Sequence, residues 1–340
     1  MAVRTQDNSL LTYDEWKLKR LETIGASIFG ILVYGSKWTS NLELFYQYIG
    51  AKSNDVENIR MFLGTETEDI TAKCWGYYGG TEQSVVENAR KGNLIKQCEK
   101  TNLTYFNDDY SYLSCTPDRK ILPYGKYEGR GNGSLELKNT QSFVLNSYET
   151  GLPTDNVIQL CGQLMITGWD YGELFYFIDN SKFQCHELER KDMGNIEEVI
   201  LTHTTDFFER VLAARPLYNQ LFDAQRNFNQ RLVGELQNEI SALEPPVQNT
   251  IGYRDFLTER YKDKMADIGI VKGDEIQLQV AQKHKQLAKE VDKIEADKLK
   301  LEIELKHIIG DNNTLDFGKN GKVTWIENKN GKRGFSNKVK

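Results

Sequence analysis

Two short segments decide what this chain folds into: Cys115-Thr116-Pro117-Asp118 and Gly131-Asn132-Gly133-Ser134-Leu135-Glu136-Leu137-Lys138. Pro-Asp occurs once in the sequence, whereas Glu-x-Lys occurs five times, and only the copy at Glu136 follows Pro-Asp at the distance of a hairpin. Leucines alternate with Glu136 and Lys138, so we expect a strand that presents both charged side chains on one face. Two carboxylates and an amine at neighbouring strand ends can hold Mg²⁺ and an attacking water.

An ordinary solvated hairpin with a surface charge pair is the alternative for these residues. Two glutamines favour the metal site. Gln159 and Gln163 lie four residues apart in the segment 157–167, whose apolar residues recur at helical spacing. They would share one helix face, and their amides can bond a carboxylate, a metal-bound water or a phosphate.

Two segments nearer the N-terminus carry further candidates. The segment 61–78 is expected to be helical and contains Glu68, although Glu66 and Asp69 are chemically equivalent choices for an additional carboxylate. Arg20 and Ser27 bracket a turn that contains glycine, and a guanidinium beside a hydroxyl suits a terminal phosphate. A structural role on a helix surface is the alternative for each of them.

Taken in order, these pieces resemble the lambda exonuclease and YqaJ-like phage recombination nucleases of the PD-(D/E)XK superfamily. The likeness covers residues 12–215, and its motifs lie at 20–27, 64–68, 115–118, 131–138, 159–164, 175–179 and 187–190. The resemblance implies an α/β fold with a restriction-endonuclease-like core, in which helices flank a central mixed sheet. It also implies a metal-dependent DNA exonuclease that degrades double-stranded DNA ends 5′→3′ and leaves 3′ single-stranded tails for phage-type homologous recombination.

The family's functional residues map onto this sequence one by one. By resemblance, the catalytic set is Asp118, Glu136, Lys138 and Gln159, with Lys138 positioning and activating the water. The implied ligands of Mg²⁺, of which two ions are expected and for which Mn²⁺ can substitute, are Asp118, Glu136, the Leu137 backbone carbonyl and Glu68. Arg20 and Ser27 match the family's pocket for the 5′-phosphate. The sequence departs from the family pattern at Ile28, Asn139 and Cys161, where an acid, Thr or Cys, and a glutamine are more usual.

The formal net charge of −6 means that DNA contacts must be local, because the protein as a whole repels phosphate. Basic residues gather in 118–138 and again in 319–340. The DNA contacts predicted from charge, amide chemistry and one aromatic are Gln163, Arg119, Lys120, Arg130 and Trp325. For Trp325 the alternative is a hairpin that caps a helix.

The chain is expected to divide into three parts. These are a nuclease core (1–216), a helical extension (217–310) with a long coiled-coil-like helix at 274–309, and a basic C-terminal hairpin and tail (311–340). Arg215-Pro216 is predicted to end the helix 196–214, and further helices are expected at 217–242 and 254–267. Apolar residues recur every seventh position from Val280 to Ile308, which predicts either a coiled coil or an amphipathic helix packed on its own core.

Composition excludes several classes. No apolar run is long enough for a membrane span, and the first residues lack the apolar stretch of a signal peptide, so we expect a cytoplasmic protein, of phage or prophage origin by resemblance. Five scattered cysteines and four histidines show no disulfide or zinc spacing. A trimeric ring and a single-strand annealing partner are implied by the resemblance alone. The alternative functions are a PD-(D/E)XK endonuclease or repair nuclease and, third, a non-catalytic DNA-binding or assembly protein.

Overall fold

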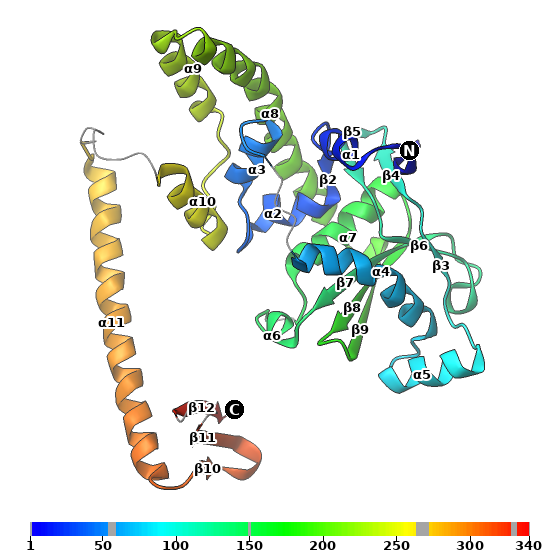
Figure 1. Cartoon of the computed structure of the whole chain (residues 1–340), viewed down its shortest axis with the longest axis vertical. Helices are drawn as coiled ribbons and strands as arrows, with labels where there is room; N and C mark the ends of the chain where they lie inside the picture. The colour runs from blue at the N-terminus through cyan, green and yellow to red at the C-terminus, as the bar shows by residue number, and fades with distance from the viewer. Residues whose placement is uncertain (1, 54–58, 149–150, 263–271, 328–331, 340) are drawn as a thin grey trace. The chain divides into compact units, whose positions relative to one another are not determined.

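The computed structural model describes residues 2–53, 59–148, 151–262, 272–327 and 332–339 (Figure 1). They belong to two compact units, Met1–Asp263 and Lys264–Lys340. The first unit combines mixed β-sheet with flanking helices, and the second consists of a long helix and a small antiparallel sheet. The predicted α/β class, with its long C-terminal helix and small C-terminal sheet, is confirmed.

The first unit contains two sheets. Their strands are β1 (Val3–Asp7), β2 (Ile24–Gly25), β3 (Cys98–Glu99), β4 (Leu103–Asn107), β5 (Tyr110–Cys115), β6 (Arg119–Ile121), β7 (Gly133–Thr140), β8 (Tyr171–Ile178) and β9 (Lys182–Glu189). The strand orders are β1-β4-β5-β2 and β3-β6-β7-β8-β9. The helices are α1 (Tyr13–Arg20), α2 (Phe29–Tyr34), α3 (Asn41–Tyr48), α4 (Ile59–Tyr77), α5 (Glu82–Lys91), α6 (Ser142–Leu145), α7 (Thr154–Thr167), α8 (Ile196–Arg226), α9 (Gln230–Ala242) and α10 (Ile251–Tyr261).

Strand β7 is central to the five-stranded sheet and has a helix against each face. It pairs with β8 in parallel and with β6 in antiparallel fashion. Leu135 and Leu137 pack on one face in a cluster with Trp75 of α4. Glu136 faces the other way and bonds to the side chains of α7. The alternation predicted for this strand is therefore the alternation observed.

Two glycines let α2 pack closely on α7. A Cβ at Gly30 would lie 2.5 Å from the Asp155 Cα, and one at Gly162 would lie 2.4 Å from the Phe29 ring. Any larger residue at either position would push the two helices apart. This contact brings the 3₁₀ turn Ala26–Ile28, which carries Ser27, beside the helix that carries Gln159 and Gln163.

The prediction that Pro216 ends a helix is wrong. Helix α8 continues through it to Arg226. Proline removes one helical hydrogen bond, but Val211, Ala214 and Leu221 are buried on either side of it, and their packing outweighs that loss. Helix α10, which covers the start of the helix predicted at 254–267, ends at Tyr261. The rest of that prediction, from residue 263 on, lies outside the described residues.

The second unit contains the predicted long helix, α11 (Glu275–Ile309), which begins with a capping box formed by Asp274 and Gln277. It leads into the sheet β10 (Thr314–Asp316), β11 (Gly321–Glu327) and β12 (Arg333–Val339), which has one strand more than the predicted hairpin (Figure 1). Trp325 lies under Arg333, whose guanidinium is 4.0 Å from the ring centroid and bonds to the Gly310 carbonyl. This matches the alternative of a sheet that caps the end of the helix.

Candidate active site

Asp118 lies where β6 begins, and its carboxylate faces the backbone of β7. Register pairing between the two strands reaches Arg119 opposite Leu135 and goes no further. Beyond that pair, the Leu137 N–H of β7 points toward the β6 side and donates to Asp118 Oδ2 at 2.8 Å. A strand residue's N–H and C=O point toward the same neighbour, so the Leu137 carbonyl is directed to the same side. Burial and the Glu136 carboxylate raise the pKa of Asp118 well above its ordinary value.

Glu136 is 2% exposed, and each of its oxygens is held by an amide of α7. Gln159 Nε2 donates to Oε1 at 2.7 Å and Gln163 Nε2 donates to Oε2 at 2.6 Å. The Ser134 hydroxyl donates to the side-chain Oε1 of Gln163 at 2.5 Å, which fixes the orientation of that amide. The glutamines predicted to share a helix face do so, and both serve the carboxylate.

Lys138 completes the group. Its Nζ lies 2.6 Å from Glu136 Oε1 and 3.1 Å from Gln159 Oε1. Burial would lower the pKa of Lys138, but the Glu136 and Asp118 carboxylates outweigh it and raise that pKa above its ordinary value. The side chain is therefore a cation bonded to Glu136 and Gln159, with one ammonium proton left for a water or a phosphate oxygen.

The donor set fits Mg²⁺ better than zinc. Among the described residues, no three His, Cys, Asp or Glu side chains lie close enough together to hold one metal ion. Structural and catalytic zinc sites need three or four such ligands. Mg²⁺ retains several waters and takes one or two carboxylates, a requirement that Asp118, Glu136 and the Leu137 carbonyl meet.

Glu68 lies at the edge of this group and is held by Arg119. The Arg119 guanidinium is 3.3 Å from Glu68 Oε2 and also pairs with Asp69. Glu68 lines the cavity described below, whereas the Asp69 side chain is 84% exposed. Of the three acids that the sequence left open, Glu68 is the one beside the site.

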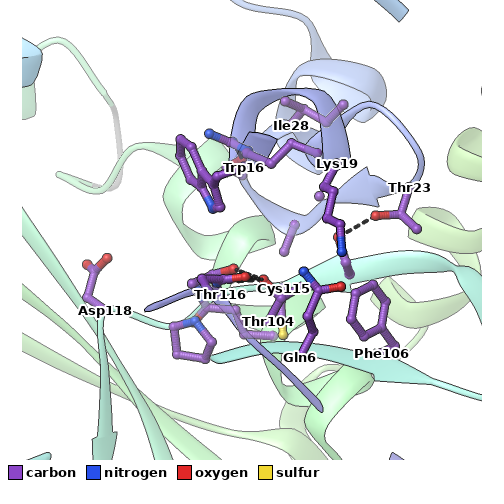
Figure 2. A pocket seen from close by; sticks show the side chains of 18 of the residues that line it. Gln6, Trp16, Lys19, Thr23, Ile28, Thr104, Phe106, Cys115, Thr116 and Asp118 are labelled. Atoms are coloured by element: carbon purple, nitrogen blue, oxygen red, sulfur yellow. Dashed lines mark hydrogen bonds between the residues drawn. The ribbon is translucent and has the colours of Figure 1, made fainter. Parts of the chain in front are cut away.

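A cavity of about 450 Å³ joins Asp118 to the predicted phosphate pocket. Its lining includes Arg20, Ser27, Glu68, Asp118, Gln159 and Gln163. Arg20 Nη2 donates to the Ser27 hydroxyl at 3.2 Å, and its guanidinium lies 4.6 Å from the centre of the Trp16 ring. Figure 2 shows Asp118 at one side of the cavity and Trp16, Ile28 and Lys19 around the other. The two predicted sites, far apart in sequence, are therefore two ends of one cavity.

Comparison with known proteins identifies the segment that builds this cavity. Residues 15–170 match the model of the YqaJ-like viral recombinase domain. This match covers 156 of the 340 residues, and the matched segment is called the YqaJ-like domain below. The domain contains every predicted catalytic, metal-binding and phosphate-binding residue, from Arg20 to Gln159.

Individual relatives of the YqaJ-like domain are distant. The uncharacterized protein YqaJ of Bacillus subtilis (strain 168) is 25% identical over 189 residues, which are 54% of this chain. The match is 52% of that relative, so the chain spans about half the length of the relative it matches. The alkaline exonuclease LHK-Exo from Laribacter hongkongensis is similar at 18% identity and a TM-score of 0.42, over 66% of this chain and 99% of that one. The crystal structure of LHK-Exo in complex with dAMP is similar at 17% identity and a TM-score of 0.43, again over 66% of this chain and 99% of that one.

Four predicted DNA contacts have other partners in the YqaJ-like domain and the strands beside it. Gln163 is 1% exposed and holds Glu136 at the cavity wall, and Arg119 is 3% exposed and pairs with Glu68 and Asp69. Lys120 pairs with Glu99, and Arg130 pairs with both Glu187 and Glu189. Trp325 belongs to the second unit. The acids that pair with the three cations come from helix α4 and from strands β3 and β9, which a local charge pattern does not report.

The sequence interpretation missed several polar residues of the YqaJ-like cavity. Trp16 and Lys19 lie on α1 and line the cavity beside Arg20. Trp16 precedes Arg20 by four residues, and this i, i+4 spacing could have predicted that the ring lies beneath the guanidinium. Thr104 and Thr116 also line the cavity, and their hydroxyls are 3.0 Å apart (Figure 2). Thr104 lies in β4 and Thr116 directly follows β5, the strand that pairs with β4. No local pattern in the sequence indicates that these two residues meet.

Proposed function

We propose that this chain is a metal-dependent deoxyribonuclease that digests duplex DNA from its 5′ ends and leaves 3′ single-stranded tails. The observation that carries the proposal is the single cavity that runs from Asp118, Glu68 and Gln159 to the Arg20–Ser27 pair. Gln159 in turn bonds to Glu136 and Lys138. A 5′-phosphate bound at Arg20 and Ser27 would direct the adjoining phosphodiester bond toward Asp118. The YqaJ-like domain supports a role in phage-type recombination.

The residues divide the work as follows. When bound, Mg²⁺ lowers the pKa of a coordinated water and offsets charge on the phosphate. Asp118, Glu136 and the Leu137 carbonyl hold the ion, and the two glutamines keep Glu136 in one orientation. Lys138, as a cation, orients the attacking water through its remaining ammonium proton and can donate a proton from Nζ to an oxygen of the phosphate. Arg20 and Ser27 bind the 5′-phosphate through charge-assisted hydrogen bonds.

The test is digestion of three DNA substrates in Mg²⁺ and in EDTA. The substrates are linear duplex with a 5′-phosphate, the same duplex with a 5′-hydroxyl, and closed circles. We expect metal-dependent loss of the linear DNA, fastest for the phosphorylated ends, and intact circles. Cutting of circles would point to an endonuclease, and intact DNA in every arm would contradict any nuclease.

A further inference from the structure

Arg119 is a buried cation that contacts two residues of the cavity lining, Glu68 and Asp118, and takes no part in the proposed reaction. Its side chain is 3% exposed. Three oxygen acceptors surround its guanidinium: Glu68 Oε2 at 3.3 Å, an Asp69 carboxylate oxygen, and the Asp118 backbone carbonyl at 2.6 Å. A buried arginine with this set of acceptors is fixed in place, because each acceptor removes freedom from the planar fork.

The two elements that Arg119 joins both supply the acidic end of the cavity. Arg119 belongs to β6, directly after Asp118, and Glu68 belongs to α4. Seven residues further along α4, the Trp75 Nε1 donates to the carboxylate of Glu173 on β8. These two points on helix α4 are about two turns apart, and the Asn139 amide of β7 also donates to the Thr67 hydroxyl of α4 at 3.3 Å. Of these contacts, the one from Arg119 holds a carboxylate that lines the cavity.

We propose that Arg119 is a positioning residue that keeps Glu68 beside Asp118 and thereby sets the affinity of the site for divalent cations. This inference rests on the proposed function, since it assumes that Asp118 and Glu136 bind the cation. Glu68 has a partly exposed side chain, at 24%, and would turn toward solvent without the guanidinium. Asp118 would then lose both a neighbouring carboxylate and the donor to its backbone carbonyl.

A simple charge effect predicts the opposite sign. Arg119 is a cation near a proposed cation site, so its removal by charge alone should strengthen metal binding. If Arg119 positions Glu68, its removal should weaken metal binding, as loss of an outer-shell partner commonly does by roughly 10–100-fold. The sign of the change therefore separates the two explanations.

The experiment is calorimetric titration of the full chain with Mg²⁺ alone, without DNA. The variants are Arg119→Gln, which removes the charge, and Arg119→Lys, which retains the charge but loses the fork. We expect both to bind Mg²⁺ about tenfold more weakly or worse. Tighter binding by Arg119→Gln with unchanged binding by Arg119→Lys would overturn the inference. So would a lower melting temperature with unchanged Mg²⁺ affinity, which marks a purely structural residue.

Two matched acid variants guard against misfolding of the arginine variants. Glu68→Gln removes the partner that lines the cavity and should weaken Mg²⁺ binding about as much, while Asp69→Asn removes the exposed partner and should leave binding unchanged. Equal effects of the two would contradict a specific role for Glu68.

Asp118→Asn distinguishes this inference from the proposed function. If Asp118→Asn abolishes Mg²⁺ binding while the Arg119 and Glu68 variants bind normally, only the inference fails. If Asp118→Asn also binds normally, the metal site is misassigned, and the inference and the proposed function fail together.

Discussion

Glu136 has no side-chain freedom in this site, because three donors hold its two oxygens. Lys138 and Gln159 share one oxygen, and Gln163 holds the other. Buried carboxylates with this many partners keep one rotamer, which is what a metal ligand needs before the metal arrives. Lys138 has more freedom, since its side chain is 27% exposed.

We therefore expect Lys138→Ala to lose cleavage and retain DNA binding. Loss of a positioned acid–base group typically costs about 10²–10⁴-fold in rate. Binding and digestion should be measured side by side on one preparation. Lys120→Ala, which removes a lysine paired with Glu99, is the matched control and should digest DNA at the parental rate. Digestion by Lys138→Ala at that same rate would show that the lysine is misassigned.

The other end of the cavity gives a prediction about substrate choice. Arg20→Gln removes the guanidinium above Trp16 and leaves Ser27 in place. A charge-assisted hydrogen bond contributes about 1.5–3 kcal/mol, so KM for 5′-phosphorylated DNA should rise about ten- to a hundredfold. KM for 5′-hydroxyl DNA should stay the same. An equal rise for both ends would mean that Arg20 does not read the phosphate.

At this scale the sequence predicted which side chains come together better than it predicted their surroundings. Asp118, Glu136, Lys138 and Gln159 come together because strand alternation and helical spacing are local properties. The fate of Arg119 was not predictable in this way. Whether a cation faces DNA or a carboxylate depends on which helix lies over its strand, and α4 is fifty residues away in sequence.

At the scale of elements, one buried carboxylate of the sheet binds both α4 and the segment that follows it. Glu173 of β8 is fully buried and accepts hydrogen bonds from Trp75, Lys96, Lys126 and Tyr127. Burial alone would raise the pKa of Glu173, but Lys96, Tyr127 and Lys126 outweigh it and lower that pKa to about 2. Such a carboxylate stabilises the folded chain only while it is ionised.

This gives a pH dependence with a definite sign. The folded-state pKa of about 2 lies below the ordinary 4.5, so the stabilisation is complete above pH 4.5 and is lost as pH falls toward 2. Its full size is roughly 3 kcal/mol. Denaturant unfolding of the parent and of Glu173→Gln should differ most at pH 7 and converge below pH 4.5. Glu99→Gln, a partly exposed acid, should show little difference at any pH, and a constant gap for Glu173→Gln would refute the assignment.

The elements themselves were predictable where their pattern is strong. Helices α7 and α11 and strand β7 appear where periodicity placed them, and β8 contains the segment 175–178 that the family resemblance singled out. Strand β1 carries no local strand signal, because its residues are mostly polar and exposed and show no apolar alternation. It exists through pairing with β4, about a hundred residues later, which no local pattern reports.

For the whole molecule, the exposed face of α11 is the feature most relevant to assembly. Leu287, Val291, Ile294 and Leu301 lie on the predicted heptad seam and are 46–65% exposed. The described residues thus give no support to the alternative in which this seam packs on its own core. The coiled coil and the trimeric ring stay predictions.

A mass measurement tests the seam. Ile294→Asp places a charge in the seam, whereas Ala296→Asp places one on the opposite face of the same helix. We expect sedimentation to show a lower molecular mass for Ile294→Asp and the parental mass for Ala296→Asp. An assembly that survives Ile294→Asp must form through another surface.

The glycine contact between α2 and α7 has a further consequence. Gly30 and Gly162 fix how closely the turn that carries Ser27 approaches the helix that carries Gln159, and so they fix the length of the cavity. In the proposed reaction that length decides which phosphodiester bond reaches Asp118 once the terminal phosphate is anchored. The absence of a side chain at these two glycines would then set the step size of digestion. Gly162→Ala should therefore change the length of the released products more than it changes their rate of release.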